Sequence, residues 1–168
     1  TLSSGSPLKE YVARTLVIPM SQHIGAPCKP LVEVGDEVKL GQKIGEPAGF
    51  VSAPIFASAS GKVVAVEPRP HVNGMQVLSV VIEDDGKDTL DESVQPHGTV
   101  DSLSGEEIRK IISDAGIVGM GGAAFPTHVK YALKPEQKVD YIILNGAECE
   151  PYLTSDHRMM LEHSDKIV

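Results

Sequence analysis

Residues 32–64 contain an internal half-repeat in which a glycine turn leads into alternating apolar residues. The first copy passes through the Gly35-Asp36 turn, and the second passes through Ser60-Gly61. Glycine supplies the positive φ that a tight turn needs, and alternation places every second side chain on one face of a strand. The half-repeat therefore predicts short hairpin strands that close around a small core, which is a small all-β domain.

The residues on either side extend this domain. Residues 15–18 are apolar and β-branched, as expected of a first strand, and Pro19 closes it. Residues 77–82 form a more continuous apolar run. We therefore assign residues 1–14 as a lead-in and residues 15–84 as the β domain.

Beyond the β domain the pattern changes twice. Charged and turn-forming residues dominate residues 85–103, which predicts a solvated acidic linker. Ser104 and Glu107 then have the spacing of a capping box, and the apolar period becomes 3.6. We expect an amphipathic helix over about 105–115, ended by Gly116 in the C′ position.

The next stretch, Gly116 to Lys130, has four glycines in its first seven residues and is called the glycine loop below. A backbone without side chains can approach a ligand closely and point its N–H groups at it, as in phosphate-binding loops, although a plain surface turn is the alternative. The stretch follows a helix and contains neither Gly-x-Gly-x-x-Gly nor Gly-Lys-Ser/Thr, so it matches neither the Rossmann fingerprint nor the P-loop. We expect a helix from Pro126 to about Leu133 that places Lys130 near an anionic ligand.

A second polar loop follows an apolar segment. Residues 139–144 predict a strand covered on both faces, and residues 145–151 supply an Asn and two Glu beyond its end. Such a loop is placed where α/β sheets bind ligands, and its oxygens can accept hydrogen bonds from ribityl or ribose hydroxyls; an acidic surface turn is the alternative. Residues 155–168 predict the start of a further helix.

Composition excludes several function classes. A net charge of −8 disfavours sequence-independent binding of nucleic acid, which needs Lys and Arg to neutralise phosphates. No apolar run is long enough to cross a bilayer. The two cysteines, Cys28 and Cys149, lie far apart and form no Cys-x-x-Cys pair, so this chain is expected to hold neither an iron–sulfur cluster nor a metal ion. His23, His71 and His128 are scattered and are interpreted as ordinary polar or packing residues.

The β domain resembles the barrel-sandwich hybrid of lipoyl and biotinyl carrier domains. Those domains share its Gly-Asp-x-Val-x-x-Gly-x-x-Ile motif followed by Ala-Pro and Gly-x-Val. Carriers need a modifiable lysine on the hairpin between the two halves, and no lysine occurs between Lys43 and Lys62. The domain is therefore expected to serve as a docking or structural module.

The two loops together resemble the flavin-binding region of the NADH-oxidising flavoprotein of respiratory complex I, and more closely the RnfC family. RnfC chains are the electron-entry subunits of Rnf ion-translocating ferredoxin:NAD oxidoreductase complexes. They share the motif at Gly116–Lys130, Asn-x-x-Glu-x-Glu-Pro at 145–151, His-Ile-Gly-Ala-Pro at 23–27 and Glu-Cys-Glu-Pro-Tyr at 148–152. The resemblance implies an α+β, multidomain chain, in which residues 104–168 are the first part of an α/β FMN- and NADH-binding domain.

The resemblance also implies the cofactors and their contacts. FMN would lie against the glycine loop, with Lys130 near its phosphate or ring, and NAD(H) would lie beside it. The implied cofactor-binding residues are Gly119, Gly121, Gly122, Ala123, Phe125, Lys130, Asn145, Glu148 and Glu150. Among these, Asn145 and Glu148 would hold flavin polar atoms, Phe125 would face the nicotinamide nucleotide, and Glu150 would help hold its ribose. No catalytic side chain is implied, because the flavin itself exchanges hydride with NAD(H) and releases single electrons to iron–sulfur clusters.

Departures from the complex I pattern occur at three positions. Met120 stands in place of an Arg, Ala124 in place of a Gly, and Ala147 in place of an acid. The first removes a phosphate-binding charge, the second tightens the loop, and the third removes one hydrogen-bond acceptor for the flavin.

RnfC chains continue into the rest of the flavin domain, a ubiquitin-like domain and a ferredoxin-like segment with two 4Fe-4S clusters. We therefore expect this sequence to be the N-terminal portion of a longer protein, inactive by itself. The resemblance implies other Rnf subunits as partners, ferredoxin as an indirect partner, no nucleic acid, and a peripheral place on the cytoplasmic face of the bacterial membrane. Two alternatives are a flavin and iron–sulfur cobalamin reductase of bacterial microcompartments and a non-catalytic docking fragment.

Overall fold

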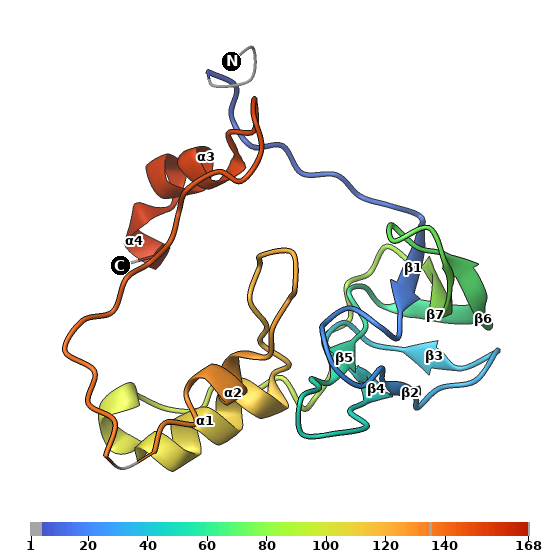
Figure 1. The fold of residues 1–168 in the computed structure, drawn as a ribbon. Coiled ribbons are helices and arrows are strands. Elements are labelled where there is room, and N and C mark those ends of the chain that lie inside the picture. The colour runs from blue at the N-terminus through green and yellow to red at the C-terminus, as the bar shows by residue number, and fades with distance from the viewer. Residues whose placement is uncertain (1–4, 135, 168) are drawn as a thin grey trace. The chain divides into compact units, whose positions relative to one another are not determined.

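The computed structural model describes residues 5–134 and 136–167, and the chain divides into two compact units (Figure 1). One unit is Ala13–Lys134, which holds both the β domain and the glycine loop. The other unit joins the N-terminal segment up to Val12 to the residues from 136 onward.

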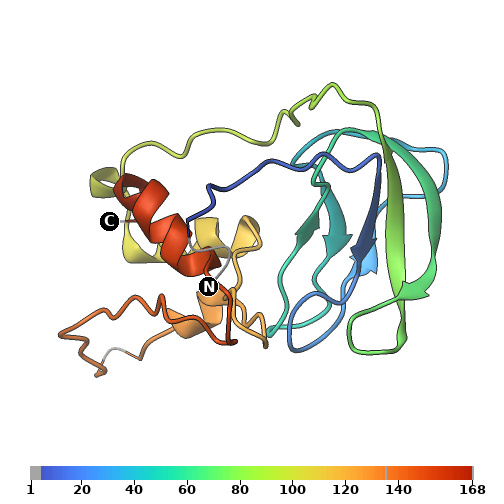
Figure 2. The same ribbon diagram turned by 90° about the horizontal axis from the view of Figure 1, so that it is seen from above.

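Two antiparallel sheets form the β domain (Figures 1 and 2). The four-stranded sheet has the order β1 (Thr15–Pro19), β7 (Gln76–Asp84), β6 (Gly61–Pro70) and β3 (Glu37–Val38), and the three-stranded sheet has the order β2 (Lys29–Pro30), β4 (Lys43–Glu46) and β5 (Ile55–Phe56). Strands β6 and β7 form a long hairpin whose register runs from Gly61 opposite Asp84 to Pro70 opposite Gln76. The predicted first strand and the predicted strand over 77–82 are confirmed.

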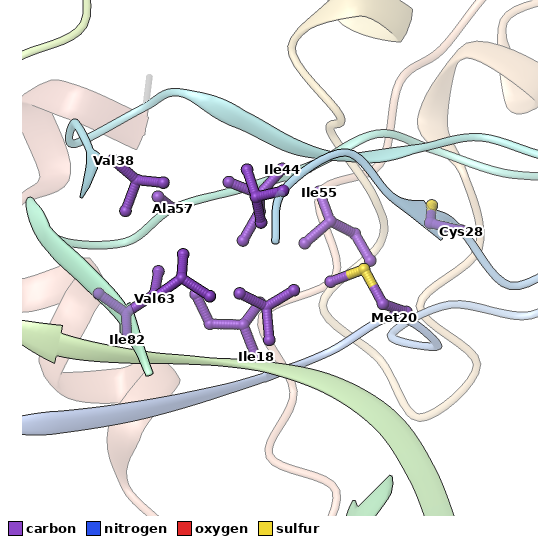
Figure 3. Packing of buried hydrophobic residues seen from close by; sticks show 11 residues of the cluster. Ile18, Met20, Cys28, Val38, Ile44, Ile55, Ala57, Val63 and Ile82 are labelled. Carbon is purple, nitrogen blue, oxygen red and sulfur yellow. The ribbon is translucent and has the colours of Figure 1, made fainter. Parts of the chain in front are cut away.

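One hydrophobic core lies between the two sheets (Figure 3). Ile18, Val63 and Ile82 point into it from the four-stranded sheet, and Ile44 and Ile55 point into it from the three-stranded sheet. Removing such a side chain from water contributes about 1.5–3 kcal/mol. Val38, Ile44 and Val63 of the half-repeat therefore share one core, and the small all-β domain is confirmed.

Backbone hydrogen bonds between the two copies of the half-repeat lock them together. The N–H of Gly35 donates to the carbonyl of Val63 at 2.8 Å, and the N–H of Val63 donates to the carbonyl of Asp36 at 2.8 Å. Further along, the N–H of Gly41 donates to the carbonyl of Ala57 at 2.9 Å. Each copy thus supplies hydrogen-bond partners to the other.

The first part of the predicted linker is attached to the β domain. The buried hydroxyl of Ser60 donates to Oδ1 of Asp85 at 2.7 Å and accepts from the N–H of Thr89 at 2.9 Å. Leu40 pairs with this segment through its N–H to Thr89 and its carbonyl to Asp91. These contacts satisfy backbone groups at the domain edge, so the segment is more ordered than its charged composition predicts. A 3₁₀ turn, η1 (Val100–Ser102), comes before the next helix.

Helix α1 (Gly105–Asp114) confirms the capping-box prediction. The N–H of Glu107 donates to Oγ of Ser104 at 3.3 Å, and the N–H of Ser104 donates to Oε2 of Glu107 at 2.8 Å. The Ser104 hydroxyl also donates to Oε2 of Glu107 at 2.6 Å, and this bond, followed by the one from the Ser104 N–H, lowers the pKa of Glu107 from its usual value. Gly116 has φ of +67°, as a glycine after a helix end commonly does.

Helix α2 (Thr127–Lys130) is shorter than predicted, because it begins after Pro126 and ends at Lys130. No strand forms over residues 139–144 in the part of the chain that the structure describes, so that prediction is wrong for this structure. Ile142 and Ile143 are 86% and 88% exposed. A strand needs a neighbour to pair with, and these residues have no strand beside them in the described chain.

The predicted last helix is divided in two. Helix α3 (Ser155–Glu162) is followed by its C-cap residue His163 and then by α4 (Ser164–Ile167). The predicted end at Val168 lies outside the described residues. The N–H of Leu8 donates to a carboxylate oxygen of Glu162 at 3.4 Å, which ties the N-terminal segment of this unit to α3. Over the described residues, no helix is long and apolar enough to span a membrane.

Candidate functional site

The glycine loop follows α1 and ends in α2, and its base is closed by backbone hydrogen bonds. The N–H of Gly119 donates to the carbonyl of Phe125 at 2.8 Å, and the N–H of Thr127 donates to the carbonyl of Ile117 at 2.9 Å. These bonds bring the two sides of the loop together and leave residues 120–124 as its tip. The base of the loop is therefore fixed by two backbone hydrogen bonds.

The tip of the loop is open. A Cβ atom added at Gly121 or Gly122 would meet no other atom within 4 Å. Within the described residues, the N–H groups of Met120, Gly121, Gly122 and Ala123 donate no hydrogen bond. Four successive unpaired N–H groups make a concentration of positive partial charge that an anion can satisfy.

Lys130 adds a full positive charge to the same loop. A Cβ atom added at Gly119 would lie 2.6 Å from Nζ of Lys130, so the glycine leaves room for the amine. No Asp or Glu occurs between Asp114 and Glu136, although the chain as a whole carries a net charge of −8. Free N–H groups, a lysine and the absence of side chains at Gly121 and Gly122 suit the binding of an anionic group.

Phe125 and Ala123 complete the set of predicted residues in this unit. Phe125 is half-buried at the base of the loop, and Ala123 lies at the tip. The structure thus brings together six of the predicted site residues: Gly119, Gly121, Gly122, Ala123, Phe125 and Lys130.

The glycine loop is held by the β domain through contacts that the sequence did not predict. The N–H of Ile24 donates to the carbonyl of Ala123 at 2.9 Å. Nε2 of His128 lies 3.3 Å from the carbonyl oxygen of Phe50, and the rings of Phe50 and His128 meet edge to face with centroids 6.2 Å apart. Figure 2 shows the segment between α1 and α2 reaching the loops at one end of the β domain.

The sequence did contain one pointer to these contacts. Ile24 belongs to the His-Ile-Gly-Ala-Pro motif at 23–27. The motif identified the family, but nothing in its residue types says which distant segment it touches. Phe50 and His128 carried no pattern that distinguishes them from ordinary surface residues.

A buried polar cluster supports the Ile24 segment. Nε2 of His23 lies 3.1 Å from both the N–H nitrogen and the carbonyl oxygen of Ala53. The thiol of Cys28 donates to the same carbonyl at 3.1 Å. Burial raises the pKa of the Cys28 thiol, and the carboxylate of Glu46 adds to this, which outweighs the lowering effect of the Ser52 hydroxyl. Cys28 is thus a neutral, buried hydrogen-bond donor rather than a nucleophile.

Asn145, Glu148 and Glu150 lie in the second unit. Oδ1 of Asn145 accepts from the N–H of Ala147 at 3.0 Å and closes its own turn. Oε1 of Glu148 accepts from the N–H of His157 at 3.0 Å, in the first turn of α3. The side chain of Glu150 is exposed. Asn145 and Glu148 therefore order the polar loop, which leaves their remaining polar atoms as the groups able to meet a ligand.

Comparison with protein families identifies both parts of the chain. Residues 1–87, just over half of the sequence, match the family model described as the RnfC barrel sandwich hybrid domain. The chain belongs to the RnfC family. Residues 112–168 match a second model, the Nuo51 FMN-binding domain, which covers the glycine loop and the polar loop.

Curated relatives agree with membership of the RnfC family. The chain is 60% identical to a subunit of the Na⁺-translocating ferredoxin:NAD⁺ oxidoreductase complex from Acetobacterium woodii, over 91% of this chain and 34% of that protein. It is 56% identical to the corresponding protein of the proton-translocating complex from Clostridium ljungdahlii, over 90% of this chain and 33% of that protein. A protein of the ion-translocating oxidoreductase complex from Pseudomonas aeruginosa is 40% identical, over 99% of this chain and 22% of that protein. The chain thus spans about a third of the length of the first two relatives.

Proposed function

We propose that this RnfC chain carries one wall of an FMN site through which a membrane-bound Rnf-type complex exchanges electrons between NAD(H) and ferredoxin, coupled to ion translocation. The observation that carries the proposal is the open glycine loop with the amine of Lys130 beside Gly119 at its base. That loop falls inside the region matched by an FMN-binding domain model. The names of the relatives supply the reaction and the complex.

Each residue of the loop has a separate task in this proposal. Gly119, Gly121 and Gly122 leave the surface flat, so that the flavin can lie against backbone. The free N–H groups at 120–123 and the amine of Lys130 bind the phosphate or polar ring atoms of FMN. FMN bound there would supply the chemistry, which is hydride transfer with NADH and release of single electrons.

The family pattern also gives tasks to the polar loop at 145–151 and to Phe125. Oxygen atoms of Asn145 and Glu148 hold flavin polar atoms, and Glu150 accepts from ribose hydroxyls of NAD(H). Phe125, from the glycine loop, offers a ring face to the nicotinamide nucleotide. These assignments rest on the match of the two loops to the family pattern and on the chemistry of the side chains.

The same proposal assigns the wider setting. The two 4Fe-4S clusters that accept electrons from FMN belong to parts of RnfC proteins outside this sequence. Other Rnf subunits hold the protein at the cytoplasmic face of the membrane, and ferredoxin exchanges electrons with the complex indirectly.

Flavin and NADH titrations test the proposal directly. In the full-length protein, binding should shift the visible absorbance of added FMN and quench its fluorescence. NADH should then bleach the absorbance of the bound flavin. Gly121→Val should abolish FMN binding without unfolding the protein, because a side chain fits at this position when no ligand is bound.

Gly105→Val is the matched control for that variant. Gly105 also has open space around the added Cβ, but it lies at the start of α1 and outside the loop. This control should bind FMN normally. If Gly121→Val binds FMN with unchanged affinity, the role given to the loop is wrong. If the wild-type protein binds no flavin and oxidises no NADH, the electron-transfer function is wrong, and a docking module is the remaining alternative.

A further inference from the structure

We propose that the β domain acts as the positioning scaffold of the glycine loop, and that His23 is the positioning residue. This inference rests on the proposed function, because it concerns the affinity of the same loop for FMN. It gives the β domain a defined role in place of the carrier function that its missing lysine excludes.

The hydrogen bonds around the His23 ring favour one tautomer. Nδ1 lies 3.2 Å from the carbonyl oxygen of Ile24, which can only accept, so Nδ1 carries the proton and donates. Nε2 then has a free lone pair and accepts from the N–H of Ala53 at 3.1 Å. The carbonyl of Ala53 is satisfied by the thiol of Cys28. The ring, only 8% exposed, thus joins Ile24 to Ala53 with no donor or acceptor left unmet.

These two residues belong to different loops of the β domain, which pack as one body. Ser52 donates its hydroxyl hydrogen to the carbonyl of Ala26 at 2.9 Å, and the N–H of Ala26 donates to the carbonyl of Val51 at 3.1 Å. Gly25 has φ of +106°, and a Cβ atom there would lie 2.0 Å from the Val51 carbonyl oxygen. The loop at 21–28 and the hairpin at 47–54 therefore cannot move independently without breaking several bonds.

The paired loops contact the glycine loop at two points. Ile24, whose carbonyl is held by His23, donates its own N–H to the carbonyl of Ala123. The hairpin meets His128 through the ring and carbonyl of Phe50. One contact thus fixes the tip of the glycine loop beside Gly122, and the other fixes the helix that carries Lys130.

The location of the hairpin supports this role. It connects β4 to β5, between the two halves of the repeat, where carrier domains display their modified lysine. Here the same hairpin supplies Phe50 and Ala53 to the contacts described above. A hairpin that serves a mobile arm in one setting is therefore used as a fixed support in this one.

Pre-organisation explains the expected effect on binding. A loop already held in its binding conformation loses less conformational freedom when FMN binds, so its affinity is higher. Without the His23 ring, Ile24 is no longer fixed, and Ala123 loses a well-oriented donor. We expect His23→Ala in the full-length protein to raise the Kd for FMN about tenfold, which corresponds to about 1.4 kcal/mol.

The experiment measures FMN affinity and backbone amide exchange in four proteins: wild type, His23→Ala, His23→Gln and His71→Ala. His23→Gln should recover much of the affinity, since its amide oxygen can accept from the N–H of Ala53. His71 also hydrogen-bonds to backbone, but within the β6–β7 turn, so His71→Ala should leave the Kd unchanged. The Ile24 amide should exchange faster in His23→Ala than in wild type, while the amides of β6 and β7 remain protected.

The outcomes separate this inference from the proposed function. If wild type binds no FMN, the proposed function fails. If wild type binds FMN and His23→Ala binds it equally well, with faster exchange at Ile24, the scaffold has no influence on the site and the inference is wrong. Equal losses of affinity in His23→Ala and His71→Ala would also overturn it, because a general loss of β-domain stability would then explain both. Should His23→Ala fail to fold, Ser52→Ala weakens the same pair of loops, and an unchanged Kd in that folded variant counts equally against the inference.

Discussion

Nζ of Lys130 lies where a side chain at Gly119 would stand, 2.6 Å from the position of an added Cβ atom. The amine therefore rests against the base of the glycine loop, next to its tip in the sequence, although Lys130 is the last residue of α2. Within the described residues it forms no ion pair, so its charge is available to a ligand.

Replacing this lysine should weaken FMN binding without harming the fold. Lys130→Gln removes one charge-assisted hydrogen bond, which is worth roughly 1.5–3 kcal/mol, so the Kd for FMN should rise at least about tenfold. Because the side chain is exposed, the melting temperature should not change. Fluorescence titration with FMN and with riboflavin measures the effect, and a loss confined to FMN assigns the amine to the phosphate.

Lys62→Gln is the matched control, since it removes an equal charge from an exposed position on β6. It should leave FMN affinity unchanged. A similar loss of affinity in both variants would mean that only the overall charge of the protein matters, which contradicts a contact at Lys130.

Ala124 stores backbone strain that glycine would relieve. Its φ of +44° lies in the left-handed region, which costs a residue with a Cβ atom about 1–2 kcal/mol. Glycine removes most of this cost but gains freedom in the unfolded chain, so Ala124→Gly should stabilise the protein by roughly 0.5–1 kcal/mol. Denaturant unfolding measures the change, and Ala123→Gly, whose φ is not positive, should give no gain.

The sequence predicted correctly those elements that depend on interactions between residues close together in the chain. The Ser104–Glu107 capping box placed the start of α1 correctly, because its hydrogen bonds join residues three apart. The half-repeat predicted the β domain because alternation reports which face of a strand is buried. The openness of the tip at Gly121 also followed from composition, since glycine adds no side chain to close it.

The failures concern features whose cause lies far away in the sequence. Residues 139–144 are as apolar as a buried strand, but Tyr141 is 86% exposed, since a strand forms only where a neighbour supplies hydrogen bonds. His23 looked like an ordinary packing residue, and only its distance to Ala53 shows that it joins two loops. The charges of the segment after Asp85 predicted a solvated linker. The sequence gives no sign that the buried hydroxyl of Ser60 binds this segment.

Acid should detach that segment from the β domain. The Ser60 hydroxyl, followed by the N–H of Lys87, lowers the pKa of Asp85 below its usual 3.8. The ionised carboxylate is therefore the form that the folded state favours, and its contribution is complete above about pH 3.8 and lost as the pH falls through the lower folded value. The attachment should be unchanged from about pH 7 to about pH 4.5 and weaken only below pH 3.8.

The same attachment can be broken at neutral pH by Asp85→Ala. Limited proteolysis with mass spectrometric mapping should then show faster cleavage within residues 85–91. Asp101→Ala removes an exposed acid outside this segment and serves as the control. Cleavage at the wild-type rate in Asp85→Ala would show that the backbone pairing at Leu40 holds the segment by itself.

The two cysteines should differ sharply in reactivity, and the difference reports on the paired loops that hold the glycine loop. The attacking species in alkylation is the thiolate; Cys28 is 4% exposed with a raised pKa, whereas Cys149 is exposed. Brief treatment of the native protein with iodoacetamide, followed by peptide mapping, should label Cys149 and leave Cys28 unlabelled, and denaturant should expose both.

His23→Ala should accelerate labelling of Cys28, because the ring lies 3.8 Å from its sulfur and covers it within the same cluster. Labelling of Cys28 as fast as Cys149 in the native wild-type protein would show that the two loops open readily, and a support that opens readily cannot hold the glycine loop in place.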